Sequence, residues 1–161
     1  MKLISNALTL FIIIVLVIIC MQGKPREQVS LDLSERELFE LTRAIYHEAR
    51  GEDALGQAAV AHVILNRVKS PLYPDTVREV VWQPDQFSFT NDGRSERMTD
   101  LQAIQKAVDT ALAVSRGKIK DPTGGALHYF AHKKVRPSWA KGGFKFILGE
   151  HTFVKLARRW P

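Results

Sequence analysis

The chain has 161 residues, of which 45% are hydrophobic and 25% charged, and these values predict one folded domain with a packed core. They exclude a disordered chain, a collagen-like chain and a tandem array. The 23 Lys and Arg residues outnumber the 17 Asp and Glu residues, giving a formal net charge of +6. This charge suits nucleic acid, anionic lipid or an acidic cell-wall polymer, and charge alone does not choose among them.

An apolar segment precedes the folded part. The run from Ala7 to Met21 is apolar at every position except Thr9 and carries no charge, which predicts a signal peptide or a signal-anchor over residues 1–23. The anchor is favoured because no A-x-A cleavage site follows. We therefore expect an N-terminal hydrophobic helix that holds the protein to a membrane, a linker over 24–33, and a domain over 34–161 outside the cytoplasm. The only cysteine, Cys20, lies in the leader, so no disulfide is expected in the domain.

The first predicted helix covers residues 35–49. It begins at a capping box, with Ser34 at the N-cap and Glu37 at N3, and Gly51 ends it. One face of this helix collects four residues within roughly 80° on the helical wheel. They are Leu38, Leu41, Ile45 and Glu48.

The position of Glu48 on that face suggests chemistry. A carboxyl group at the end of an apolar stripe is partly desolvated, which raises its pKa and suits it to act as a general acid. Two alternatives remain open at this point. Glu48 could form a structural ion pair with Arg43, Arg50 or Arg67, or it could turn out to solvent at a frayed helix end.

Further elements follow in chain order. Asp53 predicts the cap of a second, almost wholly apolar helix that ends near Val68, and residues 76–82 predict a short helix or turn. Residues 83–89 read as a loop with some extended character, and a long helix is expected from Thr99 or Asp100 to Gly117. Three short strands follow, at residues 127–131, 144–148 and 151–154, the last two joined by a turn at Gly149 and Glu150. Helices followed by a small antiparallel sheet predict an α+β fold.

Other reaction classes find little support. His47 and Glu48 do not extend to an H-E-x-x-H motif because Gly51 occupies the second histidine position. His128 and His132 are four residues apart, but extended chain would place them two pleats apart and not one helical turn apart, and no exported cysteine is available as a further ligand. No G-x-S-x-G motif, P-loop or dinucleotide fingerprint is present, so we expect no metal and no cofactor. Basic and aromatic residues gather in the last third of the chain. Such a mixture binds sugars, anionic polymers or single-stranded nucleic acid, and export argues against nucleic acid as a partner.

Residues 41–68 (LTRAIYHEARGEDALGQAAVAHVILNRV) resemble the start of the SleB-type cell wall hydrolase domain, the family of spore cortex-lytic enzymes and related bacterial and phage lysins. Four later stretches resemble further motifs of this family in the same order, so that the resemblance covers residues 38–155. They are VVWQPDQFS at 80–88, DPTGGAL at 121–127, VRPSWA at 135–140 and GEHTF at 149–153.

The resemblance implies a lysozyme-like α+β enzyme that cleaves peptidoglycan between N-acetylmuramic acid and N-acetylglucosamine, as a lytic transglycosylase that gives 1,6-anhydro products. The catalytic glutamate of the family maps onto Glu48. Substrate-binding residues by the same analogy are Gln86, Phe87, Ser88, His128, Tyr129 and His151. The expected partners are the glycan strands and, through the leader, a membrane, and the expected state is a monomer.

Three alternatives stay open. A hydrolase with two carboxylates would need Glu52, Asp85 or Asp92 as the second acid. An N-acetylmuramoyl-L-alanine amidase would cut the peptide stem from the glycan instead. A protein that has kept the fold could also bind the wall without catalysis.

Overall fold

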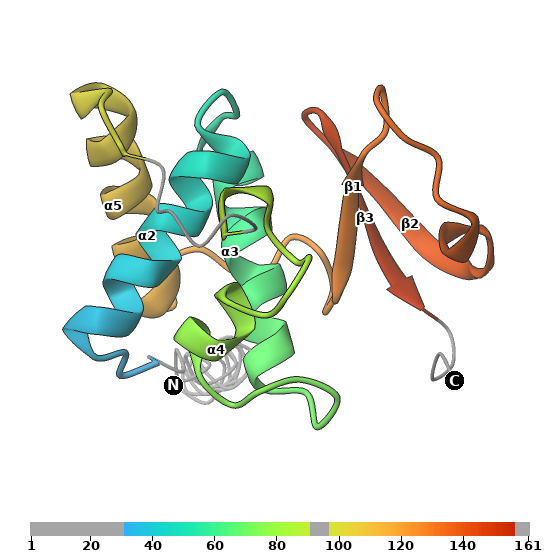
Figure 1. Cartoon of the computed structure of the whole chain (residues 1–161), viewed down its shortest axis with the longest axis horizontal. Helices are drawn as coiled ribbons and strands as arrows, with labels where there is room; N and C mark the ends of the chain where they lie inside the picture. Colours follow the sequence, from blue (N-terminus) through green and yellow to red (C-terminus); the bar gives the residue numbers. More distant parts are fainter. Residues whose placement is uncertain (1–30, 91–96, 157–161) are drawn as a thin grey trace, which may run out of the picture.

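The computed structural model describes residues 31–90 and 97–156, and within them the order of elements is helices first and strands last. The helices are α2 (Glu35–Ala49), α3 (Ala54–Val68), α4 (Val77–Val81) and α5 (Leu101–Ser115), with 3-10 turns η1 (Ser88–Thr90) and η2 (Ser138–Gly142). The strands are β1 (His128–Ala131), β2 (Gly143–Leu148) and β3 (His151–Leu156). The helices lie together on one side and the sheet stands beside them (Figure 1), which confirms the predicted α+β class.

The predicted leader, residues 1–23, and most of the predicted linker lie outside the described residues. Within the described ranges, no helix is both long enough and apolar enough to cross a membrane. The anchor and the domain limits at 34 and 161 therefore stay predictions.

Helix starts follow the capping residues. The Ser34 side chain accepts a hydrogen bond from the Glu37 backbone N–H, and the Glu37 carboxylate accepts one from the Ser34 N–H at 3.2 Å, so both halves of the capping box form. Asp53 accepts from the Gly56 N–H at 2.7 Å and starts α3. The predictions of helices over 35–49 and from Asp53 to Val68 are confirmed.

The helical core forms around α2 and α3. Six apolar residues of α3 have no exposed surface, namely Ala58, Ala59, Val60, Ala61, Val63 and Ile64. The helix is thus apolar on nearly every side because it is surrounded, with α2, α4 and α5 packed against it and strands on its remaining face. Its small alanines allow the neighbouring backbones to approach closely.

The sheet is antiparallel with strand order β1-β3-β2. Phe153, on the central strand, is paired with Tyr129 of β1 and Phe146 of β2. These side chains share the face that packs against the helices, where they join Ala49 and residues of α3 in a second apolar cluster. The carboxyl end of α2 is therefore held directly against the sheet.

The segment 83–89 differs from the expectation of extended character. Asp85 has a left-handed φ of 61°, and the chain then turns through η1 without pairing to a strand. Phe87 and Phe89 alternate as they would in a strand, but both side chains are buried in the helical core. The alternation therefore arises because both phenylalanine side chains fix a loop to the helical core, and it does not indicate a strand.

The connection from α5 to β1 is organised by one carboxylate. Asp121 accepts hydrogen bonds from the Thr123 N–H at 2.7 Å, the Gly125 N–H at 2.9 Å and the Asn66 side chain at 2.9 Å. Gly124 and Gly125 both have positive φ, at 63° and 87°, a conformation that favours glycine. The D-P-T-G-G stretch therefore builds the turn that carries the chain from the helices to the sheet.

Candidate functional site

Glu48 lies in the last turn of α2, where that helix meets the sheet. Its side chain is half-buried, and the Tyr129 hydroxyl of β1 donates a hydrogen bond to Glu48 Oε2 at 3.1 Å. Both open alternatives can now be judged. The side chain is not turned fully to solvent, and no ion pair engages it among residues 31–90 and 97–156.

The three arginines that could have paired with Glu48 are engaged elsewhere. Arg43 forms an ion pair with Glu40 at 3.3 Å. Arg67 donates from Nε to the Leu127 carbonyl at 2.8 Å, and the Arg50 guanidinium lies over the Tyr46 ring. Glu48 therefore has a tyrosine hydroxyl as its neighbour in place of a cation.

Burial raises the pKa of Glu48, and this effect outweighs the Tyr129 hydrogen bond and the more distant Lys134 charge, both of which lower it. Burial and the nearby Glu48 carboxylate raise the pKa of Tyr129 well above its ordinary value. Tyr129 consequently remains a phenol and a donor. The pair holds a carboxyl group that keeps its proton to higher pH than an exposed glutamate does.

Glu52, which the sequence offers as a possible second carboxylate, is also buried. Its Oε1 accepts a hydrogen bond from the Glu150 N–H at 2.8 Å and lies 3.3 Å from His151 Nδ1. Gly149 lies directly against it, since a Cβ at that position would overlap Glu52 Oε2. Glu52 therefore ties the β2–β3 turn to the start of α3.

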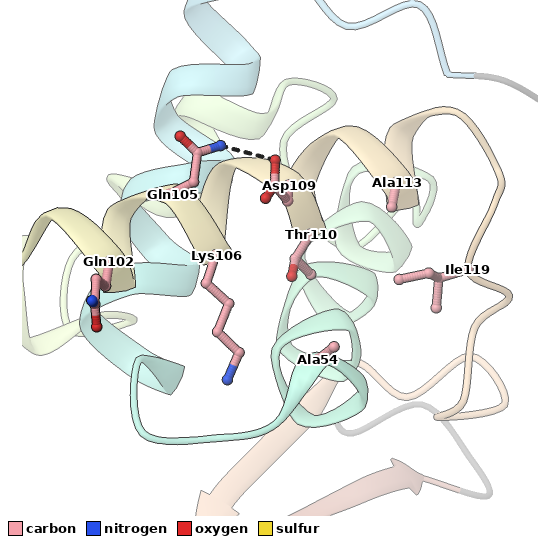
Figure 2. A pocket seen from close by; sticks show the side chains of 8 residues that line it. All are labelled: Ala54, Gln102, Gln105, Lys106, Asp109, Thr110, Ala113 and Ile119. Carbon is pink, nitrogen blue, oxygen red and sulfur yellow. Dashed lines mark hydrogen bonds between the residues drawn. The ribbon is translucent and has the colours of Figure 1, made fainter.

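The backbone of Glu52 is held as well. The Lys106 ammonium donates to the Glu52 carbonyl oxygen, and Figure 2 shows Lys106 reaching from α5 toward the turn that joins α2 to α3. The same view contains a hollow of about 540 Å³ between α5 and the start of α3. This hollow does not include Glu48.

His151 connects the two acids. Its ring packs edge-on against the Tyr129 ring, with centroids 5.2 Å apart, while its Nδ1 faces Glu52. Burial lowers the pKa of His151 although the Glu52 carboxylate opposes the shift, so the imidazole is neutral at pH 7. The row Glu52, His151, Tyr129, Glu48 runs from the α2–α3 turn across the sheet to the end of α2. We call these four residues the acid row.

The remaining predicted substrate-binding residues are not all gathered here. Phe87, which the resemblance predicts to bind substrate, is 1% exposed and belongs to the helical core. Gln86 and Ser88 flank it on the surface. Strand alternation places His128 on the opposite face of β1 from Tyr129, where its ring contacts Trp139 at 5.3 Å between centroids.

The candidate second carboxylates also separate. Asp85 is exposed on its turn, and Asp92 lies outside the described residues. No group of three or more His, Cys, Asp or Glu side chains in the described part of the chain is arranged to hold a metal ion.

Sequence alone could not distinguish Glu52 from a capping residue. An acid just past the glycine that ends one helix and just before the next is what a helix N-terminus favours. Its actual partners, at positions 149 to 151, are about a hundred residues away in the chain. Only the tertiary fold brings them together.

Comparison with known proteins places this geometry in a family. Residues 51–154 match the family model described as Cell Wall Hydrolase, a match that begins three residues after Glu48. The spore cortex-lytic enzyme of Oceanobacillus iheyensis is 38% identical over 135 residues, which are 83% of this chain and 46% of that protein. The chain spans less than half the length of the curated relatives it matches.

Two solved structures have a similar fold. The catalytic domain of the germination-specific lytic transglycosylase SleB from Bacillus anthracis aligns with a TM-score of 0.62 and 34% identity, covering 77% of this chain and 98% of that one. The catalytic domain of the Bacillus cereus SleB protein aligns with a TM-score of 0.63 and 34% identity, covering 83% of this chain and all of that one.

Proposed function

The chain belongs to the cell wall hydrolase family, and from this premise we propose that it is an enzyme that cleaves peptidoglycan glycan strands as a lytic transglycosylase. The bond cut is the one between N-acetylmuramic acid and N-acetylglucosamine, and Glu48 is the catalytic residue. One observation carries the proposal. Glu48 is a half-buried carboxyl group with a raised pKa, placed where the helices meet the sheet and contacted by a neutral phenol.

The reaction needs a single carboxyl group. Glu48 donates its proton to the glycosidic oxygen as the bond from that oxygen to C1 of the muramic residue breaks. The positive charge that develops at C1 is stabilised by the acetamido group of the same sugar. The Glu48 carboxylate then removes the proton of the muramic 6-hydroxyl while O6 bonds to C1. Glu48 ends protonated, no water is consumed, and the product is a 1,6-anhydro sugar.

The other members of the acid row are positioning residues in this proposal. The Tyr129 hydrogen bond stabilises the Glu48 carboxylate that exists between the two proton transfers. Glu52 and His151 hold the strand that carries Tyr129 against the end of α2. Glu52 is already engaged by the Glu150 N–H and His151, which disfavours it as a second acid for hydrolysis.

Location follows from the same proposal. Peptidoglycan lies outside the cytoplasm, so in this proposal residues 34–161 lie there as well. We also propose that the apolar run at 7–21 holds the protein to the membrane and that the domain acts as a monomer. Gln86 and Ser88, exposed on either side of the buried Phe87, are the members of the loop that remain available to touch a glycan strand.

Product analysis tests this function. Purified peptidoglycan is digested with the full chain, and the soluble fragments are analysed by mass spectrometry. We expect muropeptides that end in 1,6-anhydro-N-acetylmuramic acid. Fragments with reducing ends would indicate hydrolysis, and released stem peptides with intact glycan would indicate an amidase; either result would overturn the transglycosylase proposal.

A further inference from the structure

The face of the sheet that points away from the helices contains a second hollow. Its floor is one cross-strand row, in which Phe130 of β1 and Ile147 of β2 both pair with Thr152 of β3. The connection from β1 to β2, residues 132–142, forms one wall and runs outside the sheet (Figure 1). The hollow has a volume of about 540 Å³. We call it the outer-sheet hollow.

Positive charge surrounds the outer-sheet hollow without compensation. Arg136 and Lys141 of the connection and Lys145 of β2 line it, and all three are exposed. None of them has an ion-pair partner among the residues that the structure describes. Glu150, the acid nearest in sequence, is paired with Lys133 at 2.9 Å.

The excess of positive charge extends along the whole C-terminal part of the sequence. Residues 127–161 contain eight Lys and Arg residues and a single acid, Glu150, whereas residues 1–126 contain 15 basic and 16 acidic residues. The net charge of the chain therefore arises entirely in its last 35 residues, of which residues 128–156 contain the three strands. A field that extends over many ångströms favours a ligand with repeated negative charges over one with a single anionic group.

The floor adds an apolar and aromatic surface. The Phe130 ring meets the Trp139 ring edge-on, with centroids 5.8 Å apart, and Ile147 is 65% exposed. Thr152, between Phe130 and Ile147, is only 4% exposed, so the accessible part of the floor is formed by its two neighbours. A chain of sugar or alditol units can lay its carbon face on the exposed Ile147 side chain and on the rings beside it.

We propose that the outer-sheet hollow binds a phosphodiester-linked glycopolymer of the cell wall. Phosphodiesters carry a charge at every pH at which the enzyme works, and Arg136, Lys141 and Lys145 supply the charge-assisted contacts. Phe130 and Ile147 contact the units between phosphates. This site lies on the opposite face of the sheet from Tyr129 and does not depend on the chemistry of Glu48.

Binding is measured with the full chain in non-ionic detergent, as the Glu48→Gln variant, so that walls are not digested during the assay. The ligands are soluble poly(glycerol phosphate), walls that carry phosphodiester polymer, and the same walls after cold-acid extraction. We expect binding to the soluble polymer and at least about tenfold weaker binding to the extracted walls. Equal binding to both wall preparations would overturn the proposal.

Two triple variants separate the site from general charge. Arg136→Gln, Lys141→Gln and Lys145→Gln together should weaken polymer binding at least about tenfold and leave activity on extracted walls, in the background with Glu48 intact, unchanged. The matched control is Arg116→Gln, Lys118→Gln and Lys120→Gln, which removes three exposed charges at the end of α5. The control should change the affinity less than about twofold. If both triple variants lost the same affinity for the polymer, net charge alone would account for the attraction, and the proposed binding site would be wrong.

A measurement on the unsubstituted hollow gives an independent test. In methyl-labelled protein, the polymer should shift the Ile147 resonances and leave those of the fully buried Ile45 unchanged. A shift confined to residues near Glu48 would contradict the proposal. Anionic lipid vesicles and single-stranded DNA are the comparison ligands, and affinity for either that equals or exceeds that for the polymer would assign the hollow to that partner instead.

Discussion

At the scale of single residues, the account depends on the protonation of Glu48. The raised pKa means that the folded protein holds this proton more tightly than the unfolded chain does. The resulting stabilisation is fully present below the unfolded pKa and is lost as the pH rises through the folded one. Above that pH, folding must bury a charged carboxylate.

The Glu48→Gln variant tests this contribution of Glu48 to the pH dependence of stability. A glutamine has no proton to lose, so the free energy of unfolding of the wild type should fall relative to that of the variant as the pH rises from 4 to 8. Urea denaturation across this range measures the difference. A difference that does not change with pH would mean that Glu48 titrates alike in both states.

Tyr129 gives a second prediction at this scale. The Tyr129→Phe variant removes the hydrogen bond that lowers the Glu48 pKa, so the alkaline limb of the pH–rate profile should move to higher pH. The turnover rate should fall about tenfold or more, because the intermediate carboxylate loses a hydrogen bond. Tyr73→Phe is the matched control, as Tyr73 lies against His128 and Arg67. If the alkaline limb of the pH–rate profile did not shift in Tyr129→Phe, the hydrogen bond between Tyr129 and Glu48 would have no role in the mechanism.

At the scale of elements, the contact between the β2–β3 turn and the start of α3 holds the acid row together. Gly149 has a φ of 55° and faces Glu52 so closely that a side chain there would overlap the carboxylate. Gly149→Ala should therefore destabilise the fold through both backbone strain and overlap. Glu52→Ala should cost about 1–3 kcal/mol, since the Glu150 N–H and His151 lose their acceptor.

The double variant separates these effects. Removing the Glu52 side chain relieves the overlap but not the strain, so Glu52→Ala with Gly149→Ala should lose less stability than the sum of the single changes. Thermal unfolding of the four proteins measures the coupling. If the stability losses of the two single variants simply added up in the double variant, the position of the turn would not depend on its contact with Glu52.

The same elements show how far the sequence predicts the fold. Helix starts at Ser34 and Asp53 were predicted because capping is local chemistry. The strands at 143–148 and 151–156 were found with an error of one or two residues, because the turn at Gly149 and Glu150 is also local. The sequence predicts some extended character over 83–89 because Phe87 and Phe89 alternate with polar residues, and this alternation is the same whether the side chains pack in a sheet or in a helical core. Periodicity does not identify the partner.

At the scale of the whole molecule, the helices supply the acid and the sheet supplies its neighbours. Helical phasing singled out Glu48 because Leu41 and Ile45 precede it on one face, and the resemblance to the family selected the same residue. Tyr129 and His151 entered only by that resemblance. No local rule indicates that two residues on different strands meet a glutamate on α2, since strand pairing sets this contact.

The most direct test of the central claim is the initial rate at which the Glu48→Gln variant releases 1,6-anhydro muropeptides from purified peptidoglycan. Glu35→Gln, an exposed change in the first turn of the same helix, serves as the control. We predict that Glu48→Gln lowers the rate by about 10²–10⁴-fold while its thermal unfolding stays cooperative, and that Glu35→Gln keeps the wild-type rate. Release by Glu48→Gln at the wild-type rate would contradict the assignment of this carboxyl group as the acid that breaks the glycan.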